Sequence, residues 1–338
     1  MSDWLRNILD RINSPSLDWL QVEVTTYCNA GCIYCPRTLL SDQWNSRHMP
    51  MGLFNRLIPF INNTELIYLQ GWGEPLLNPR LFEMIRICKE KGKKVGFTTN
   101  GMLLTEEIAA KIIDLGLDML GISLAGATQK THNRIRMSAD FDTIIRNLKQ
   151  FSRLKEAKNS TNPSIHIAYI ILRSNFHELK DIIPLANGLG ADQVVASHLS
   201  LILKPDLYPE AIFFDKEHED EYSKTLEKIK EEAIKRNIVF EYPRPFLEKD
   251  CMVCSENINH ASVVNIEGQI LPCVFNNPVL TNGSDLDEFI SFGNLQRSNL
   301  SRVWYSKEYS RFRNIQTKKK GLVDMPLRCK KCFKRQTS

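Results

Sequence analysis

The sequence lacks long hydrophobic runs and has little excess of charge of either sign. No stretch approaches the roughly 18–20 uncharged apolar residues that a helix needs to cross a bilayer. The formal net charge of the 338-residue chain is only +5 and 43% of its residues are hydrophobic, which excludes a mainly disordered protein and gives no electrostatic reason to expect nucleic acid. The N-terminal segment has neither an apolar signal core nor a cleavage site. We therefore expect a globular cytoplasmic protein with no membrane or nucleic-acid partner.

The placement of the cysteines is more informative than the charge. Eight of the nine fall into two groups near the ends of the chain, at positions 28, 32 and 35 and at positions 251, 254, 273, 329 and 332. A disulfide framework is not expected in a reducing compartment, where short-spaced cysteines indicate metal or iron–sulfur ligation. The ninth, Cys88, lies at an apolar position of a helical pattern and is predicted to be a buried, inert thiol.

From residue 20 to about 200 the sequence alternates strand-like and helix-like segments. The predicted strands are short and rich in β-branched or apolar residues, and they cover 20–26, 65–70, 94–99, 118–124, 165–171 and 192–198. Helical patterns lie between them, and several end in Lys-Gly or Leu-Gly, a typical helix stop. Repeated β–α units imply a parallel sheet with right-handed crossovers. Six units are too few for a closed eight-stranded barrel, so we predict an α/β fold with a partial (β/α)6 barrel.

The rest of the chain divides into smaller predicted parts. Residues 1–19 are assigned to an N-terminal helix, 20–210 to the barrel, 211–249 to a helical linker and 250–338 to a small C-terminal domain. The linker contains a long charged helix over about 216–236, with acidic residues leading and basic residues trailing. The C-terminal domain shows little regular periodicity and would be marginally stable alone, so a bound metal centre is a natural way to hold it together.

The first cysteine group follows directly after the first predicted strand. Three thiolates from Cys28, Cys32 and Cys35 can converge only if the backbone loops tightly, and Gly31 tolerates a strained turn. A 4Fe–4S cluster takes four ligands and this loop provides three, which leaves one iron open to an outside ligand. A zinc site completed by a remote ligand such as His48 is the alternative.

This Cys-x3-Cys-x2-Cys loop, with the aromatic Tyr34 before its third cysteine, resembles that of the radical S-adenosylmethionine (radical SAM) superfamily. The resemblance implies a 4Fe–4S cluster on Cys28, Cys32 and Cys35, with the methionine part of S-adenosylmethionine (SAM) chelating the open iron. It also implies that one electron cleaves the sulfonium to give a 5′-deoxyadenosyl radical, which abstracts hydrogen from a substrate. An electron donor such as flavodoxin or ferredoxin is then an expected partner.

A glycine-rich segment after the second predicted strand extends the resemblance. The segment Gly71-Trp72-Gly73-Glu74-Pro75 resembles the family's Gly-Gly-Glu-Pro segment, which binds the ammonium group of the cofactor. Trp72 replaces the usual second glycine, so the match is read as Gly71 or Gly73 with Glu74 and Pro75. Glycine permits a close approach of the backbone, and Glu74 offers an acceptor to a cation.

Two further segments after the third and fourth predicted strands resemble the same family. Thr99 and Asn100 belong to a Thr-Asn-Gly turn that the resemblance places near the ribose and methionine of the cofactor. Ser123 and Arg134 are similar to the serine and the downstream arginine that meet the ribose and the carboxylate. Ala125 stands where an acidic residue is common in the family.

The second cysteine group resembles the opening of the auxiliary-cluster domains called SPASM, in the same superfamily. Four cysteines fit one fully ligated auxiliary 4Fe–4S cluster, as in the shortened twitch version, and they are Cys254, Cys273, Cys329 and Cys332. Cys251 remains open as a ligand, because its distance to Gly268 exceeds the usual range. A four-cysteine zinc ribbon is the alternative for this region.

The resemblance predicts a radical SAM enzyme that abstracts hydrogen from a C–H bond of a peptide, a protein or a small molecule. Oxidation, epimerisation or cross-linking by a maturase-type enzyme comes first, and a twitch-type dehydrogenase of a sugar or cyclitol alcohol comes second. The molybdenum-cofactor cyclase is a further relative, disfavoured because its C-terminal cluster uses three cysteines. A zinc-ribbon nucleic-acid-binding protein is the alternative of another class. The first strand begins so early that a separate peptide-recognition protein is an expected partner, and no residue is assigned to the substrate.

Overall fold

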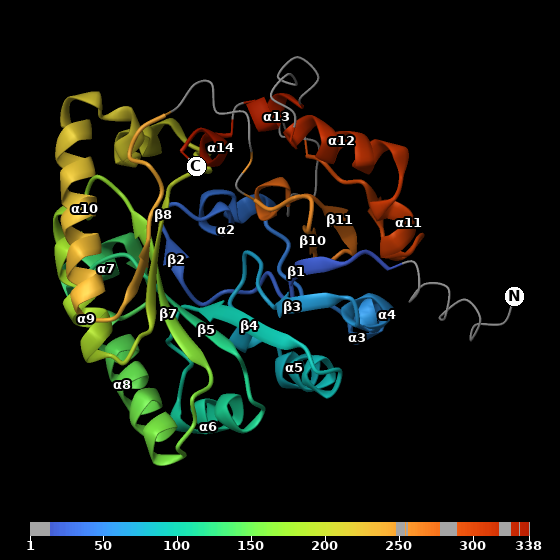
Figure 1. The fold of residues 1–338 in the computed structure, drawn as a ribbon, viewed down its shortest axis with the longest axis horizontal. Helices are drawn as coiled ribbons and strands as arrows, with labels where there is room; N and C mark the ends of the chain where they lie inside the picture. The colour runs from blue at the N-terminus through green and yellow to red at the C-terminus, as the bar shows by residue number, and fades with distance from the viewer. Residues whose placement is uncertain are drawn as a thin grey trace, which may run out of the picture. The chain divides into compact units, whose positions relative to one another are not determined.

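The structure, a computed structural model, describes residues 14–247, 254, 256–277, 289–317, 326–330 and 332–337 (Figure 1). These residues divide into two compact units. The first contains the described residues of 14–27, 42–96 and 254–335, and the second contains 28–41, 97–247 and 336–337. Within the described residues, no helix combines the length and the apolar character needed to cross a membrane.

The first unit is built on a sheet to which both ends of the chain contribute. In the order β12-β11-β10-β1-β3-β4, its strands are β12 (Gly293–Asn294), β11 (Gln269–Leu271), β10 (Ala261–Val264), β1 (Leu17–Val22), β3 (Thr64–Tyr68) and the first part of β4 (Lys94–Thr99). β1 runs parallel to both β3 and β10, with Leu20 opposite Ile67 on one side and Ser262 on the other. Because all three of these residues are fully buried, β1 is the centre of this unit's core.

Short helices complete the first unit. They are α3 (Met51–Phe54), α4 (Ile58–Ile61), α5 (Leu81–Glu90), α11 (Leu300–Trp304), α12 (Lys307–Thr317), α13 (Leu327–Lys330) and α14 (Phe333–Gln336), the last of which ends in the second unit. The Cys88 side chain on α5 is fully buried, which confirms the prediction of a buried thiol. One aromatic cluster stabilises the C-terminal helices, because Tyr309 of α12 stacks on Phe292 at 4.1 Å between ring centroids.

The second unit continues the β–α alternation. Its parallel strands follow the order β5 (Met119–Leu124), β7 (Ser164–Ile171), β8 (Gln193–His198) and β9 (Val239–Glu241), and a separate antiparallel pair joins β2 (Gly31–Cys32) to β6 (Arg136–Met137). Its helices are α2 (Pro36–Leu39), α6 (Glu106–Asp114), α7 (Gln129–Ile135), α8 (Phe141–Ala157), α9 (Ile182–Gly188) and α10 (Glu219–Lys235). Figure 1 shows α8, α9 and α10 along one side of β7 and β8.

Alternating burial and specific caps explain why these segments form where they do. Every second residue of β7 is buried and the others are half-buried, as expected for a strand with one face against helices. Thr105 and Asp140 cap α6 and α8, since their side chains accept hydrogen bonds from the Ile108 and Thr143 N–H groups. The local sequence therefore determines the helix starts, and burial determines the strand faces.

The six predicted strands are confirmed as β1, β3, β4, β5, β7 and β8, with one clear shift. β1 ends at Val22, whereas the prediction extended to residue 26. Glu23 still donates its N–H to the Val264 carbonyl of β10 at 2.8 Å, but the residues from Val24 on bond to a loop, because Met49 and Thr26 donate their N–H groups to the Val24 and Arg47 carbonyls at 2.9 Å. β1 also begins at Leu17, inside the segment 1–19 that we assigned to an N-terminal helix, so that assignment is wrong for 17–19. Residues 1–13 lie outside the described part.

The C-terminal region contains more regular structure than its sequence indicates. It provides β10, β11, β12, α11 and α12, where we expected little periodicity. Strands of two to four residues are too short to produce a recognisable alternation, which explains the difference. The predicted charged helix over 216–236 is α10, preceded by a 3-10 turn over Lys216–His218.

Candidate functional site

In the second unit, the cysteine loop lies between two short backbone anchors. Cys32 belongs to β2 and pairs with Arg136 of β6, and Ile33 donates its N–H to the Ile135 carbonyl at 3.0 Å. On the other side, the Cys35 N–H donates to the Cys32 carbonyl at 3.1 Å, and α2 begins at the next residue. The loop is therefore held to the segment after α7 by antiparallel pairing.

The three cysteines of this loop lie within electrostatic reach of one another. Cys32 is buried, and Cys28 and Cys35 are half-buried. The pKa of Cys35 is raised to about 11, mainly by burial and also by the neighbouring Cys32 and Cys28. The Arg37 N–H group opposes this rise. Thiols bind metal only after they lose their protons. A metal centre bound to these three cysteines would therefore replace their thiol protons.

This thiol group offers the donors of an iron–sulfur cluster, three thiols on one loop. Among the described residues, no three His, Cys, Asp or Glu side chains surround a position for one metal ion. In a 4Fe–4S cluster each thiolate binds a different iron, so the ligands stand farther apart than around one ion. His48, the remote ligand of the zinc alternative, lies in the first unit with its Nδ1 2.9 Å from the Thr25 hydroxyl and its ring 4.6 Å from that of Tyr27.

Arg136 brings a positive charge to the cysteine loop. Its Nη1 donates to the Tyr34 hydroxyl at 2.5 Å, and its Nε is buried with no hydrogen-bond partner among the described residues. Burial lowers the pKa of Arg136, but Cys32, Tyr34, Cys28 and Cys35 outweigh this and raise it above its ordinary value. A guanidinium in this position suits an anionic cluster with an anionic ligand beside it.

The family resemblance implied that Arg134, rather than Arg136, meets the carboxylate of SAM. Arg134 lies on α7, exposed, and donates to the Ser174 carbonyl at 3.1 Å. α7 ends at Ile135, and Arg136 then begins β6 opposite Cys32. Spacing alone could not tell which of two arginines two residues apart lies beside the cysteine loop, and the pairing of β2 with β6 places Arg136 there.

The Thr-Asn-Gly turn after β4 is tied to the cysteine loop within the second unit. Asn100 donates from Nδ2 to the Asn29 side-chain oxygen at 2.7 Å, one residue after Cys28. Its own Oδ1 accepts from the Met102 N–H at 3.0 Å, and the Thr99 hydroxyl accepts from the Gly101 N–H at 3.1 Å. Thr99 and Asn100, both predicted site residues, are therefore buried and fixed by local bonds.

Ser123 lies near the end of β5, beside a turn that a carboxylate holds. Ser123 is half-buried and pairs with Ala168 of β7. In the turn that follows, the N–H groups of Ala127 and Thr128 donate to Glu178 at 2.7 and 3.1 Å, and the hydroxyls of Thr128 and Thr131 donate to its other oxygen. Burial raises the pKa of Glu178, but these hydrogen bonds lower it more, so the carboxylate stays ionised.

In the first unit, Gly73, Glu74 and Pro75 form a tight turn against the end of β1. The Glu74 N–H donates to the Tyr27 carbonyl at 2.8 Å, and the Glu74 carboxylate accepts from the Leu76 N–H at 3.1 Å. A Cβ atom at Gly73 would lie 2.4 Å from the Thr25 carbonyl oxygen, which is too close for any side chain at this position. Only glycine fits there, which agrees with the role the sequence predicted for this segment.

The auxiliary cysteines of the first unit also lie within electrostatic reach of one another. Burial raises the pKa of Cys254 to about 12, with smaller upward contributions from Glu256, Cys332 and Cys329. Burial is also the main cause that raises the pKa of Cys273, and Glu256, Cys254 and Cys332 raise it as well. Cys251 lies outside the described residues.

Hydrogen-bond donors point at two of these sulfurs. The side-chain amide of Asn276 donates to the Cys273 Sγ at 3.1 Å. The N–H groups of Arg335 and Lys334 lower the pKa of Cys332, against the effect of burial. Donors aimed at sulfur stabilise its ionised form and tune a bound cluster, so this group has the donor chemistry of an iron–sulfur site.

Comparisons with known families agree with both cysteine groups. The sequence model of the radical SAM superfamily matches residues 22–186, and that of SPASM, an iron–sulfur cluster-binding domain, matches residues 251–333. These two families bind, respectively, a 4Fe–4S cluster with SAM and an iron–sulfur cluster. The predicted cofactors and the predicted C-terminal iron–sulfur domain are thereby confirmed.

Individual relatives extend the same similarity. The tungsten-containing aldehyde ferredoxin oxidoreductase cofactor-modifying protein of Pyrococcus furiosus is 24% identical, over 88% of this chain and 84% of its own. The probable GTP 3′,8-cyclase of Metallosphaera sedula is 30% identical, over 70% of this chain and 71% of its own. A crystal structure of Streptococcus suis SuiB bound to S-adenosylmethionine matches with a TM-score of 0.67 and 17% identity, covering 97% of this chain and 74% of that one. This last similarity confirms the predicted fold.

Proposed function

Because the chain belongs to the radical SAM superfamily and carries a SPASM domain, we propose that it is a maturase-type enzyme that uses reductive SAM cleavage to modify a C–H bond of a peptide or protein. The observation that carries this proposal is the pairing of a three-thiol loop with the Arg136 guanidinium. Three thiols leave one cluster position open, and a cation beside it suits the carboxylate of an amino-acid ligand.

Each predicted cofactor-binding residue has a role under this proposal. Cys28, Cys32 and Cys35 would hold the cluster; together with SAM it supplies, when bound, a hydrogen-atom acceptor strong enough for C–H bonds. Arg136 would pair with the SAM carboxylate in place of Arg134, and Tyr34 would orient the guanidinium through its hydroxyl. Within the first unit, the turn with Gly73, Glu74 and Pro75 would offer acceptors to the SAM ammonium group. Thr99, Asn100 and Ser123 would lie along the ribose.

The four auxiliary cysteines would hold a fully ligated second cluster. Such a cluster has no open position, so its use would be electron transfer or stabilisation rather than SAM chemistry. An oxidation of the substrate releases an electron, and this cluster is a suitable acceptor. A flavodoxin- or ferredoxin-type protein would deliver the electron that begins each turnover.

The choice of a peptide substrate rests on similarity. A second structure of Streptococcus suis SuiB, with a TM-score of 0.67 to this chain, has the precursor peptide SuiA bound. A small-molecule substrate is the second candidate, since the relative in Pyrococcus furiosus is named as a cofactor-modifying protein. The predicted separate peptide-recognition protein belongs to the first candidate only.

One anaerobic experiment tests the proposal. The reconstituted chain should hold about eight irons, the content of two 4Fe–4S clusters, and should form 5′-deoxyadenosine from SAM with a reductant. Incubation with peptides encoded by neighbouring genes should give a product two hydrogens lighter, or one whose mass is unchanged in ordinary water but which takes up deuterium when the reaction runs in deuterated water. Stoichiometric zinc without 5′-deoxyadenosine would contradict the proposal, and a mass change only in a small molecule would favour the second candidate.

A further inference from the structure

Trp72, which replaces the usual glycine of the cofactor-binding turn, makes a contact that the family resemblance does not explain. Its indole N–H donates to the backbone carbonyl of Asn277 at 3.1 Å, 205 residues away in the sequence. Trp72 and Asn277 both belong to the first unit. The turn is thus bonded directly to the segment that follows Cys273.

Glu23 links the same turn to the connection between β10 and β11. It is fully buried just after β1, and its carboxylate accepts from the Trp72 N–H at 3.0 Å and from the Ile266 N–H at 3.3 Å. A Cβ atom at Gly71 would lie 2.2 Å from the Glu23 side chain, so the turn packs against this carboxylate without a gap. Burial raises the pKa of Glu23, while the Asn277 amide and the two N–H groups oppose the rise.

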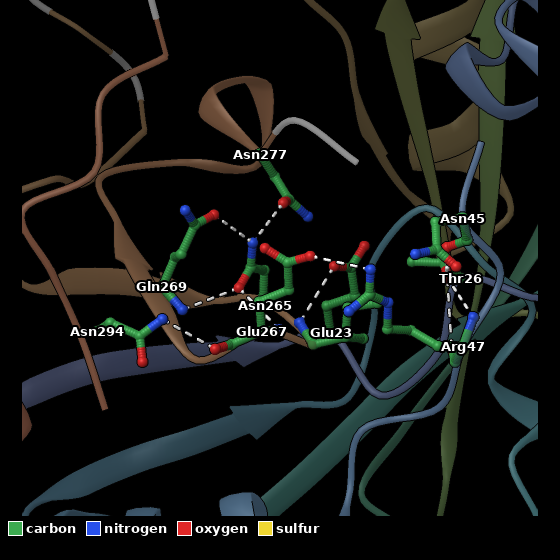
Figure 2. Close-up of polar contacts among 10 residues, drawn as sticks. Glu23, Thr26, Asn45, Arg47, Asn265, Glu267, Gln269, Asn277 and Asn294 are labelled. Carbon is green, nitrogen blue, oxygen red and sulfur yellow. Dashed lines mark hydrogen bonds and ion pairs between the residues drawn. The ribbon is translucent and has the colours of Figure 1, made fainter. Parts of the chain in front are cut away.

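Asparagine side chains complete the link on the auxiliary side (Figure 2). The Asn277 Oδ1 accepts from Asn265 at 3.1 Å, and Asn265 also donates to Gln269 of β11 at 2.8 Å. The preceding residue, Asn276, donates to the Cys273 Sγ. Two consecutive asparagines therefore bond to different partners. Asn276 bonds to an auxiliary cysteine, and Asn277 bonds to Asn265, in the connection between β10 and β11.

From these contacts we propose that Trp72 and Glu23 are positioning residues that tie the Gly71–Pro75 turn to the Cys273–Asn277 segment. The affinity for SAM then depends on whether the auxiliary cluster holds that segment in place. This inference rests on the proposed function, because it takes the turn to bind the SAM ammonium group. It adds an energetic coupling between SAM binding and the auxiliary cluster, which neither cysteine group would produce alone.

The test is a double-mutant cycle on the full chain with SAM affinity as the readout. Trp72→Phe removes the indole N–H and retains the ring. With both clusters reconstituted, it should weaken SAM binding about fivefold, as expected for the loss of about one hydrogen bond. Cys273→Ala should weaken SAM binding in the wild-type background but change it less than about twofold in the Trp72→Phe background, since the link is then already broken.

Trp44→Phe is the matched control, because Trp44 also donates its indole N–H to a backbone carbonyl, that of Thr26, at 3.1 Å. Its effect on SAM affinity should add to that of Cys273→Ala. Equal losses from Cys273→Ala in the wild-type and Trp72→Phe backgrounds would overturn the proposal, as would wild-type SAM affinity in Trp72→Phe. A wild-type holoenzyme that fails to bind SAM would instead refute the proposed function.

Glu23→Gln gives an independent measurement that does not require loss of a cluster. The amide retains the volume of the carboxylate. Its NH2 group, however, faces one of the two N–H groups from which Glu23 accepts hydrogen bonds, so that one donor loses its acceptor. SAM affinity should fall at least as much as in Trp72→Phe, while the iron content stays at the wild-type value. An unchanged SAM affinity in Glu23→Gln would also overturn the proposal.

Discussion

The two cysteine groups differ in the charge that lies beside them. In the second unit, the three thiols of the Cys28–Cys35 loop neighbour the Arg136 guanidinium. In the first unit, Cys254, Cys273 and Cys332 neighbour the carboxylate of Glu256, which is itself paired with Lys334 at 3.7 Å. Burial raises thiol pKa values in both places, so burial does not distinguish them. The neighbouring charge does: the Arg136 cation suits a cluster that must also take an anionic ligand, whereas Glu256 raises the pKa of the thiols beside it and disfavours their ionised form.

The same two units differ in how each holds a buried carboxylate against a turn. Glu178 accepts four hydrogen bonds from the turn after β5, and its pKa is lowered. Glu23, which is completely buried, accepts from two backbone N–H groups, and the Asn277 amide also lowers its pKa, yet its pKa is raised. Burial favours the neutral acid in both; it outweighs the hydrogen bonds at Glu23, whereas the four donors together outweigh it at Glu178.

The strongest challenge to the difference between the cysteine groups removes one thiol from each. Cys32→Ala should abolish SAM cleavage entirely, because a loop with two thiols cannot hold a cluster with one open iron. Cys329→Ala should leave some 5′-deoxyadenosine formation that is uncoupled from substrate turnover. Anaerobic assays of both products measure this, and full turnover by Cys329→Ala would show that the second cluster is dispensable.

Replacing each of the two neighbouring arginines sharpens the comparison further. Arg136→Met should weaken SAM binding by about 10- to 100-fold, the range for a hydrogen bond to a charged group. Arg134→Met is the matched control; because Arg134 is exposed and bonds only to a carbonyl among the described residues, it should change affinity less than about twofold. Equilibrium dialysis of the reconstituted proteins gives both values, and the reverse order would return the cationic role to Arg134.

A smaller effect is expected from neutralising the two carboxylates. At neutral pH, Glu178→Gln should lower the stability of the chain by about 2–3 kcal/mol, since charge-assisted hydrogen bonds are lost and one N–H or hydroxyl faces an amide donor. Glu23→Gln should cost less, about 1 kcal/mol or below, because removing a buried charge offsets part of the lost bonding. Anaerobic denaturant titrations compare the two, and equal losses would contradict the comparison.

The pH dependence of the same variants should be the weakest signal, and it has opposite signs. The folded-state pKa of Glu178 is lowered, so its stabilisation is present above the unfolded pKa and is lost as pH falls through the folded value. The folded-state pKa of Glu23 is raised, so its ionised form costs stability, and that cost disappears as pH falls through the raised value. The stability advantage of the wild type over Glu178→Gln should therefore grow with rising pH, and that over Glu23→Gln should shrink.

Much of the fold and part of the candidate site followed from the sequence. The six strands were predictable because each alternates or clusters apolar residues between glycines and polar turns. Cys28, Cys32 and Cys35 could be predicted as one group because their close spacing lets a tight loop bring their side chains together. Thr99, Asn100 and Gly73–Pro75 could be recognised for the same reason, as local turns that follow strands.

The remaining features depend on contacts between distant segments. Only the pairing of β2 with β6 places Arg136, rather than Arg134, beside Cys32. Only the addition of β10 to β1 brings Ile266 and Asn277 to Glu23 and Trp72. The sequence by itself determined the candidate ligands, which were predicted from residue type, spacing and family resemblance. The tertiary structure decided which charged groups and hydrogen bonds surround these cysteines. The reason is that pairing and burial across a sheet bring together residues that no local sequence pattern relates.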